Sequence, residues 1–149
     1  MCSSDLAIGL ILSGFGTGGI LFNLFVRHIV RRIRPRLMVT LGGFTCGGSI
    51  FAVSQIGDWH AAFPLMIGIG LGFYLLHNVL QTRSTEAAPG ARGVGVSLFG
   101  ISWTMGQGLG VAVMGAGVSA FGFTPMMAAY GLGLVALGLW MRFNFHRLP

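Results

Sequence analysis

The sequence predicts an all-α membrane protein, a polytopic bundle of five transmembrane helices. Only 8% of its 149 residues are charged and 54% are hydrophobic, whereas soluble domains carry about 25% charged residues. Five apolar runs each approach the roughly 20 residues that a helix needs to cross a bilayer. A soluble domain of this length cannot bury five such runs, so the lipid bilayer is the expected surroundings.

The predicted spans form one domain, residues 6–149. They cover residues 6–26, 37–56, 61–80, 94–118 and 125–143. Four of them contain glycines at four-residue spacing, which let helix backbones approach closely in lipid, where no hydrophobic force drives helices together. These pairs are Gly14 and Gly18, Gly43 and Gly47, Gly68 and Gly72, and Gly106 and Gly110. They predict helix-packing faces.

Residues 1–5 are interpreted as a non-native N-terminal scar. With a GTG start, the codons of this stretch can spell the end of a common sequencing adapter. Such a stretch is left out of fold reasoning. We therefore expect the sequence to be a fragment that enters a longer protein partway along.

The nine basic residues are all arginine, and they are expected between the spans. Arginine at the centre of a spanning helix costs roughly 2.5–3.5 kcal/mol. The first loop carries Arg27, Arg31, Arg32, Arg34 and Arg36, the third carries Arg83 and Arg92 beside Glu86, and the tail carries Arg142 and Arg147. Loops 57–60 and 121–124 carry neither arginine nor lysine.

Alternating spans place all nine arginines on one side, which the positive-inside rule identifies as cytoplasmic. The C-terminus is therefore expected to be cytoplasmic. The net charge of +6 reflects this topology, and no nucleic-acid partner is expected.

Patterns that could indicate an enzyme or a cofactor site lack their required context. Residues 14–19 read Gly-x-Gly-x-x-Gly, but no strand precedes them and no acidic residue follows about 20 residues on, as a dinucleotide site requires. The four histidines show no metal-ligand spacing. We expect no enzymatic activity, no cofactor and no metal.

Two stretches resemble a transporter family. They read GGILFNLFVRHIVRRIRPRLMVTLGG and LQTRSTEAAPGARGVGVSLFGISWTMGQGLG. From about residue 8, the chain resembles the C-terminal half of the major facilitator superfamily, near its bacterial drug and metabolite efflux branch. Arg27, Arg31 and Arg32 fall on the basic positions of that family's loop motif, roughly G-x-x-x-D-R-x-x-R-R, while Val26 occupies the acidic position. APGARG (residues 88–93) resembles the family's loop between its tenth and eleventh helices.

The resemblance implies an arrangement and a partner. The five spans would correspond to helices eight to twelve of twelve, with helix seven and the whole N-terminal half missing. Spans one, three and four would border a central cavity for a small-molecule substrate, and spans two and five would lie outside. The location would be the bacterial inner membrane.

Polar side chains within the spans are the candidates for substrate contact, because polar groups at membrane depth must face protein or water. They are Ser13, Thr17 and Asn23 in span one, Tyr74, His77 and Asn78 in span three, and Trp103, Thr104 and Gln107 in span four. Tyr74, His77 and Asn78 are expected to share one helix face. The alternative for each polar group is structural, a hydrogen bond to its own or a neighbouring helix.

The leading hypothesis is a fragment of a secondary active transporter that moves a small organic solute, as in drug or metabolite efflux, by alternating access. A proton-coupled antiporter needs a titratable group in its pathway. His77 could supply that group, but we favour a site in the missing half. The alternative is a stand-alone, non-transporting five-helix scaffold or interaction subunit.

Overall fold

A computed structural model describes residues 2–56 and 59–145, and this part of the chain is helical without strands. The five helices are α1 (Cys2–Arg32), α2 (Pro35–Gln55), α3 (Trp59–Glu86), α4 (Arg92–Phe121) and α5 (Phe123–Asn144). All five are long and apolar enough to cross a membrane. The predicted all-α class and the number of helices are confirmed, and the length and apolar character of the helices are consistent with an integral membrane protein.

The helices extend beyond the predicted spans at the arginine-rich ends. α1 continues to Arg32 and α3 continues to Glu86, so most arginines expected in loops lie in the last or first turns of helices. The physical reason is that hydropathy marks where the hydrocarbon layer ends, whereas a helix continues as long as its backbone hydrogen bonds do. Long arginine side chains at such ends can reach the polar interface.

A short break separates α1 from α2. Arg34 has the extended backbone (φ −64°, ψ 142°) that the residue before a proline favours. Pro35 then begins α2, where its missing N–H costs nothing because the first turn has no intrahelical acceptor for it. The turn therefore follows directly from the Arg34–Pro35 sequence.

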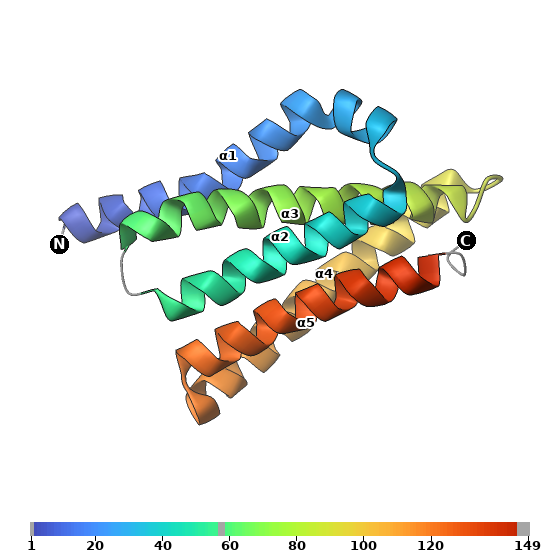
Figure 1. Cartoon of the computed structure of the whole chain (residues 1–149). Coiled ribbons are helices and arrows are strands. Elements are labelled where there is room, and N and C mark those ends of the chain that lie inside the picture. The colour runs from blue at the N-terminus through green and yellow to red at the C-terminus, as the bar shows by residue number, and fades with distance from the viewer. Residues whose placement is uncertain (1, 57–58, 146–149) are drawn as a thin grey trace.

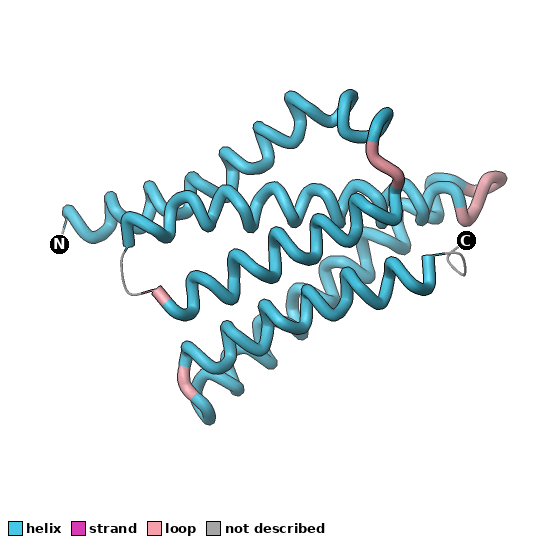
Figure 2. Tube along the Cα trace, in the orientation of Figure 1, coloured by secondary structure: helices cyan, strands magenta, loops and turns pink. Residues whose placement is uncertain are grey.

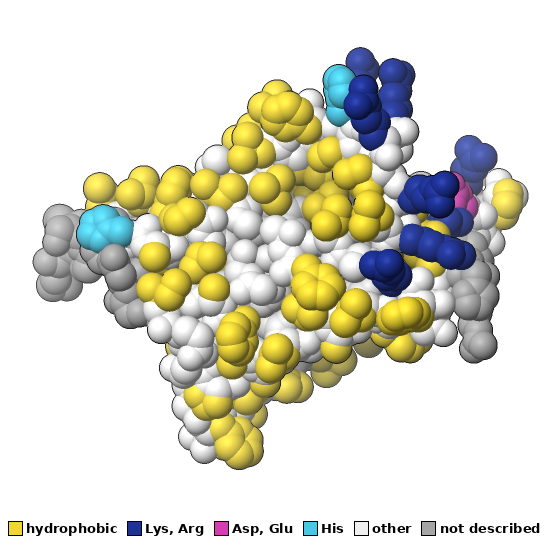
Figure 3. Space-filling model, in the orientation of Figure 1, with side chains coloured by type: hydrophobic (Ala, Val, Ile, Leu, Met, Phe, Trp, Pro, Cys, Tyr) yellow, Lys and Arg dark blue, Asp and Glu magenta, His cyan; other side chains and the backbone are white. Residues whose placement is uncertain are grey.

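The helices run alternately up and down, joined by short loops (Figures 1 and 2). The C-terminal ends of α1, α3 and α5 and the N-terminal ends of α2 and α4 consequently lie at one end of the bundle. Eight of the nine arginines lie there, and the dark blue side chains in Figure 3 mark this basic end. Arg147 lies outside the described residues. The predicted gathering of the other arginines at one end is confirmed.

The packing is uneven across the bundle. α2 lies between α3 and α5 and contacts both extensively, and α1 packs on α3 (Figure 1). α4 makes much smaller contacts with α3 and α5. The main core gathers toward the basic end, where Met38, Val39, Leu76, Met141 and Phe145 are buried together. α4 contributes nothing to that core.

Glycines make a close helix contact between α2 and α5. A Cβ atom added at Gly43 would lie 2.8 Å from Cα of Gly138, and one added at Gly47 would meet the carbonyl oxygen of Gly131. Either distance is below van der Waals contact, so only glycine permits this approach.

Three of the four predicted glycine pairs lie at close helix contacts. Gly14 and Gly18 of α1 meet α3, and Gly68 and Gly72 of α3 meet α2, in addition to the pair on α2. The fourth pair, Gly106 and Gly110 of α4, does not form the predicted packing face among the described helices. Gly106 of α4 has no neighbour within 4 Å of an added Cβ, and Gly110 meets only the Tyr130 hydroxyl. These two glycines lack close neighbours because α4 packs only loosely against α3 and α5.

Candidate functional site

A central cavity of about 420 Å³ lies between α4 and the layer formed by α2, α3 and α5. It exists because α4 packs loosely against that layer. Its polar or sulfur-bearing lining side chains are Cys46, His77, Ser102, Gln107, Tyr130 and Met141, and aromatic Phe73 and Trp103 join them. Most of these residues lie toward the middle of their helices, so the cavity occupies the central depth of the bundle.

An aromatic cluster joins α3 to α4 at the cavity wall. The His77 and Trp103 ring centroids are 5.0 Å apart at an interplanar angle of 80°. His77 also stacks on Phe73 (5.5 Å, 15°) and meets Phe99 edge-on (5.2 Å, 60°). Such ring separations are favourable for aromatic pairs. The cluster presents flat, polarisable surfaces to whatever enters the cavity.

Two polar groups of the cavity have unused hydrogen-bonding capacity. Nδ1 of His77 is the one buried side-chain nitrogen or oxygen among the described residues that lacks a hydrogen-bond partner. The Gln107 side chain is exposed on α4, and its amide can both donate and accept. Leaving a buried polar atom unpaired costs about 1–3 kcal/mol, so His77 lowers the stability of this wall unless a polar group reaches Nδ1.

The remaining candidates on α1 and α4 satisfy their hydrogen bonds within their own helices. Ser13 Oγ donates to the Leu10 carbonyl at 2.6 Å, Thr17 Oγ1 to that of Ser13 at 2.9 Å, Asn23 Nδ2 to that of Gly19 at 3.0 Å, and Thr104 Oγ1 to that of Gly100 at 3.0 Å. None of the four lines the central cavity. The structural alternative therefore accounts for their hydrogen bonds.

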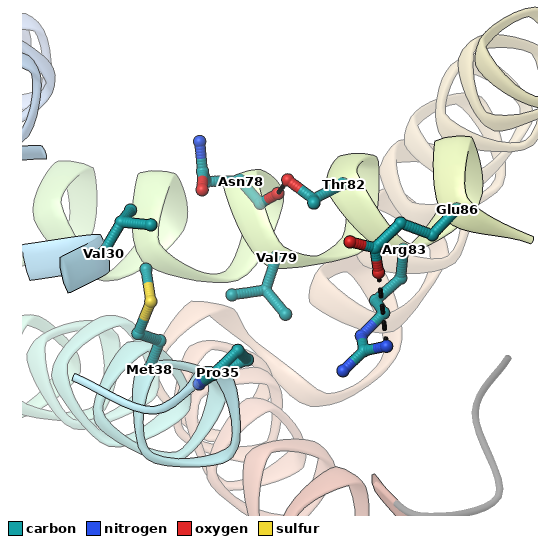
Figure 4. A pocket seen from close by; sticks show the side chains of 8 residues that line it. All are labelled: Val30, Pro35, Met38, Asn78, Val79, Thr82, Arg83 and Glu86. Carbon is teal, nitrogen blue, oxygen red and sulfur yellow. Dashed lines mark hydrogen bonds and ion pairs between the residues drawn. The ribbon is translucent and has the colours of Figure 1, made fainter. Parts of the chain in front are cut away.

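Tyr74 and Asn78 lie on the side of α3 that faces α1, whereas His77 lies on the side that faces the central cavity. Tyr74 stacks on Phe22 of α1 (6.1 Å, 20°) and packs against Gly19. Asn78 lines a smaller cavity of about 100 Å³ beside Val30, near the Arg83–Glu86 ion pair (Figure 4). The three residues therefore do not share one helix face as expected. His77 faces α4, whereas Tyr74 and Asn78 face α1.

The structure adds cavity residues that the sequence analysis did not select. Ser102 and Tyr130 line the cavity, and α2 and α5 supply much of its apolar wall, whereas α1 supplies none. The resemblance implied the reverse roles, with the first span lining the cavity and the second and fifth outside. A tyrosine within an apolar span was the available signal for Tyr130, since polar groups inside the membrane are costly unless they face protein or water.

The predicted basic residues form contacts at the basic end. Arg83 Nη1 lies 3.2 Å from Glu86 Oε2, one turn apart on α3. The guanidinium groups of Arg83 and Arg36 also lie over the Phe145 ring, at 4.7 and 5.8 Å from its centroid. These cation–π contacts tie the ends of α2, α3 and α5 together. Arg27, Arg31 and Arg32 line a separate open surface with His28.

Within the described residues, no group of three His, Cys, Asp or Glu side chains is placed to hold a metal ion. The fold is a bundle of five helices that are long and apolar enough to cross a membrane, with a mid-depth cavity lined mostly by apolar side chains. No family model matches the chain, and no curated protein or solved structure matches it either.

Proposed function

We propose that this chain is part of a secondary active transporter that moves a small, largely apolar organic solute by alternating access. The central cavity carries the proposal. It is about 420 Å³ in volume, lies at mid-depth, and combines aromatic surfaces with the hydrogen-bonding groups of His77 and Gln107. Ligand sites are typically concave and mostly apolar, with a few polar groups that fix orientation.

The loose seating of α4 favours a moving element over a static scaffold. Alternating access requires one helix group to rock against another around a fixed site. α4 borders the cavity and is largely exposed, and Gly106 and Gly108 have no neighbour where a Cβ would stand. α4 can therefore shift relative to α3 and α5 without breaking a tight glycine contact such as that between α2 and α5.

The resemblance places α1 to α5 at helices eight to twelve of a major facilitator transporter, although the observed cavity is lined by α2 and α5 and not by α1. The partner is the N-terminal half of the same transporter. Exposed polar side chains on the membrane helices support such a partner, because Gln107 and Thr104 of α4 are both exposed and polar groups facing hydrocarbon are unfavourable. A coupling proton site is assigned to that half rather than to His77.

The proposed orientation puts the basic end in the cytoplasm, with the protein in a bacterial inner membrane. The grouping of the arginines at one end of the bundle supports it through the positive-inside rule. We expect reporter fusions after Arg36, Arg92 and Pro149 to be active only as cytoplasmic reporters. Fusions near Trp59 and Thr124 should be active only as external reporters. Paired alkaline phosphatase and green fluorescent protein fusions measure this, and the opposite pattern would overturn the orientation.

The second candidate function is a stand-alone membrane scaffold or interaction subunit. The tight glycine-mediated packing of α1, α2, α3 and α5 favours it, because these helices hold together without a further partner. Reading the genomic DNA upstream of the Met1 codon separates the two functions. A frame that continues through about seven further apolar spans supports the transporter, whereas an in-frame stop codon just upstream supports the scaffold.

A transport assay tests the same distinction. In the transporter proposal, one wall of the translocation pathway belongs to the other half, so we expect the 149-residue chain alone to confer no efflux. Expression together with the upstream half should restore efflux. Efflux by the isolated chain would contradict the proposed division of the pathway between two halves.

A further inference from the structure

We propose that the basic end carries a binding site for the headgroup of an anionic phospholipid, in a groove formed by α2 and α5. The groove has a volume of about 390 Å³ and is lined by Arg34, Arg36, Leu37, Arg142 and Phe143. This inference does not depend on transport. It rests on the arrangement of three guanidinium groups beside exposed apolar side chains.

The three arginines come together because α2 and α5 are closely packed. Arg34 and Arg36 flank the start of α2, and Arg142 lies in the last turn of α5. The glycine contacts between the two helices fix the separation of these ends.

No described carboxylate neutralises this groove. Glu86 is engaged by Arg83 at 3.2 Å, and Asp5 lies on α1 at the other end of the bundle. Arginines gathered without acidic partners repel one another, and an anionic phosphate relieves that repulsion by accepting two hydrogen bonds from a guanidinium fork. Basic pockets between the cytoplasmic ends of helices bind anionic lipid headgroups in this way.

The apolar side chains that continue from the groove favour a lipid over a soluble anion. Leu37, Leu41 and Phe44 follow one stripe of α2 and are 44%, 40% and 48% exposed. Trp140 and Phe143 of α5 are 58% and 71% exposed. A ligand whose phosphate lies among the arginines can therefore lay its acyl chains along these two helices, which a nucleic acid or a free phosphate cannot do.

Quenching of Trp140 by brominated lipid tests the site, because Trp140 lies one turn from Phe143. The full chain in detergent is titrated with phosphatidylglycerol or phosphatidylcholine that carries dibrominated acyl chains. We expect half-maximal quenching at a concentration at least about tenfold lower with phosphatidylglycerol. The Trp140→Phe variant identifies the share of the quenching that belongs to this residue. Equal curves for the two lipids would overturn the proposal.

Two double variants with the same loss of charge separate a defined site from diffuse attraction. Arg34→Gln with Arg142→Gln should abolish the preference for phosphatidylglycerol, and this pair spares the Arg36 contact with Phe145. Arg27→Gln with Arg31→Gln, on α1, should keep most of it. An equal loss in both variants contradicts a site in the groove. Circular dichroism of each variant verifies that the helices remain folded.

A competition experiment distinguishes binding of an anionic lipid from binding of a soluble phosphate. Glycerol 3-phosphate and inorganic phosphate at millimolar concentration should not displace the brominated phosphatidylglycerol, because they lack acyl chains. Displacement by either would show an anion site without lipid specificity, and the proposal would be wrong. Displacement by unbrominated phosphatidylglycerol, but not by phosphatidylcholine, is the supporting result.

Discussion

Replacement of Trp103 by alanine is expected to weaken solute binding in the central cavity at least about tenfold. The indole forms part of the cavity wall and lies 5.0 Å from His77 and 5.2 Å from Phe73, centroid to centroid. An aromatic solute loses roughly 0.5–1.5 kcal/mol of ring contact, together with the apolar burial that the indole supplied. A loss of 1.4 kcal/mol is already tenfold in affinity.

Dansylamide is a suitable probe for this prediction, because it is a neutral aromatic sulfonamide whose emission rises in apolar surroundings. The purified chain is titrated in detergent, and the enhanced emission is followed. Trp140→Ala is the matched control, since Trp140 is 58% exposed and does not line the cavity. It should bind dansylamide as the original chain does, apart from the shared partition into micelles. A Trp103→Ala chain with unchanged binding would remove the main support for a solute site.

The Gln107→Ala variant distinguishes the loss of a solute contact from the loss of helix packing. Trp103 also holds α4 to α3 through the aromatic cluster, so its removal can loosen the helix itself. Gln107 is exposed and has no such structural contact among the described residues. Its replacement should leave the unfolding midpoint unchanged and weaken dansylamide binding by about fivefold, the effect of one net hydrogen bond of about 1 kcal/mol.

The number and type of the helices could be predicted because the bilayer fixes both. A run of about 20 apolar residues in lipid has to form a helix, since every backbone polar group needs an internal partner. The helix ends could not be predicted in this way. Residues 27–32 are rich in arginine and residues 81–86 are polar, yet both stretches are helical. Hydropathy carries no information about where backbone hydrogen bonding stops at the interface.

The candidate site was predictable only in part, for a different reason. His77, Trp103 and Gln107 stood out as polar or amphipathic side chains at depth, and all three line the cavity. Tyr130 and Ser102 were missed, and Ser13 and Thr17 were selected although they bond to their own helix. Helices that are apolar on every side do not reveal which neighbours they face, and the cavity depends on that arrangement.

The glycine pairs show the same limit at the level of packing. Four-residue spacing identified contacts on α1, α2 and α3, but the pair on α4 has the same spacing without a packed partner. The spacing shows that a second helix could approach closely, but it does not show that one is present. A packed and an unpacked glycine on the same helix therefore allow a direct test of the contact between α2 and α5.

Gly47→Leu is expected to lower the free energy of unfolding by about 3 kcal/mol, at the upper end of typical overpacking costs. Its Cβ would meet the Gly131 carbonyl oxygen and lie 2.9 Å from the Val135 amide nitrogen. Both are backbone atoms, so no side chain can turn aside and α2 and α5 have to separate. The gain in helix propensity from leucine, below about 1 kcal/mol, cannot offset this cost.

Gly48→Leu provides the matched control on the same helix, because nothing lies within 4 Å of a Cβ atom added there. It changes composition and propensity equally, so it should leave the stability unchanged or raise it by a few tenths of a kcal/mol. Unfolding in mixed micelles with increasing dodecyl sulfate, followed by tryptophan fluorescence, measures both variants. If Gly47→Leu matched Gly48→Leu, the close contact of α2 and α5 would be wrong. The groove that this contact holds between Arg34 and Arg142 would then lose its geometric basis, since the separation of the two helix ends would no longer be fixed.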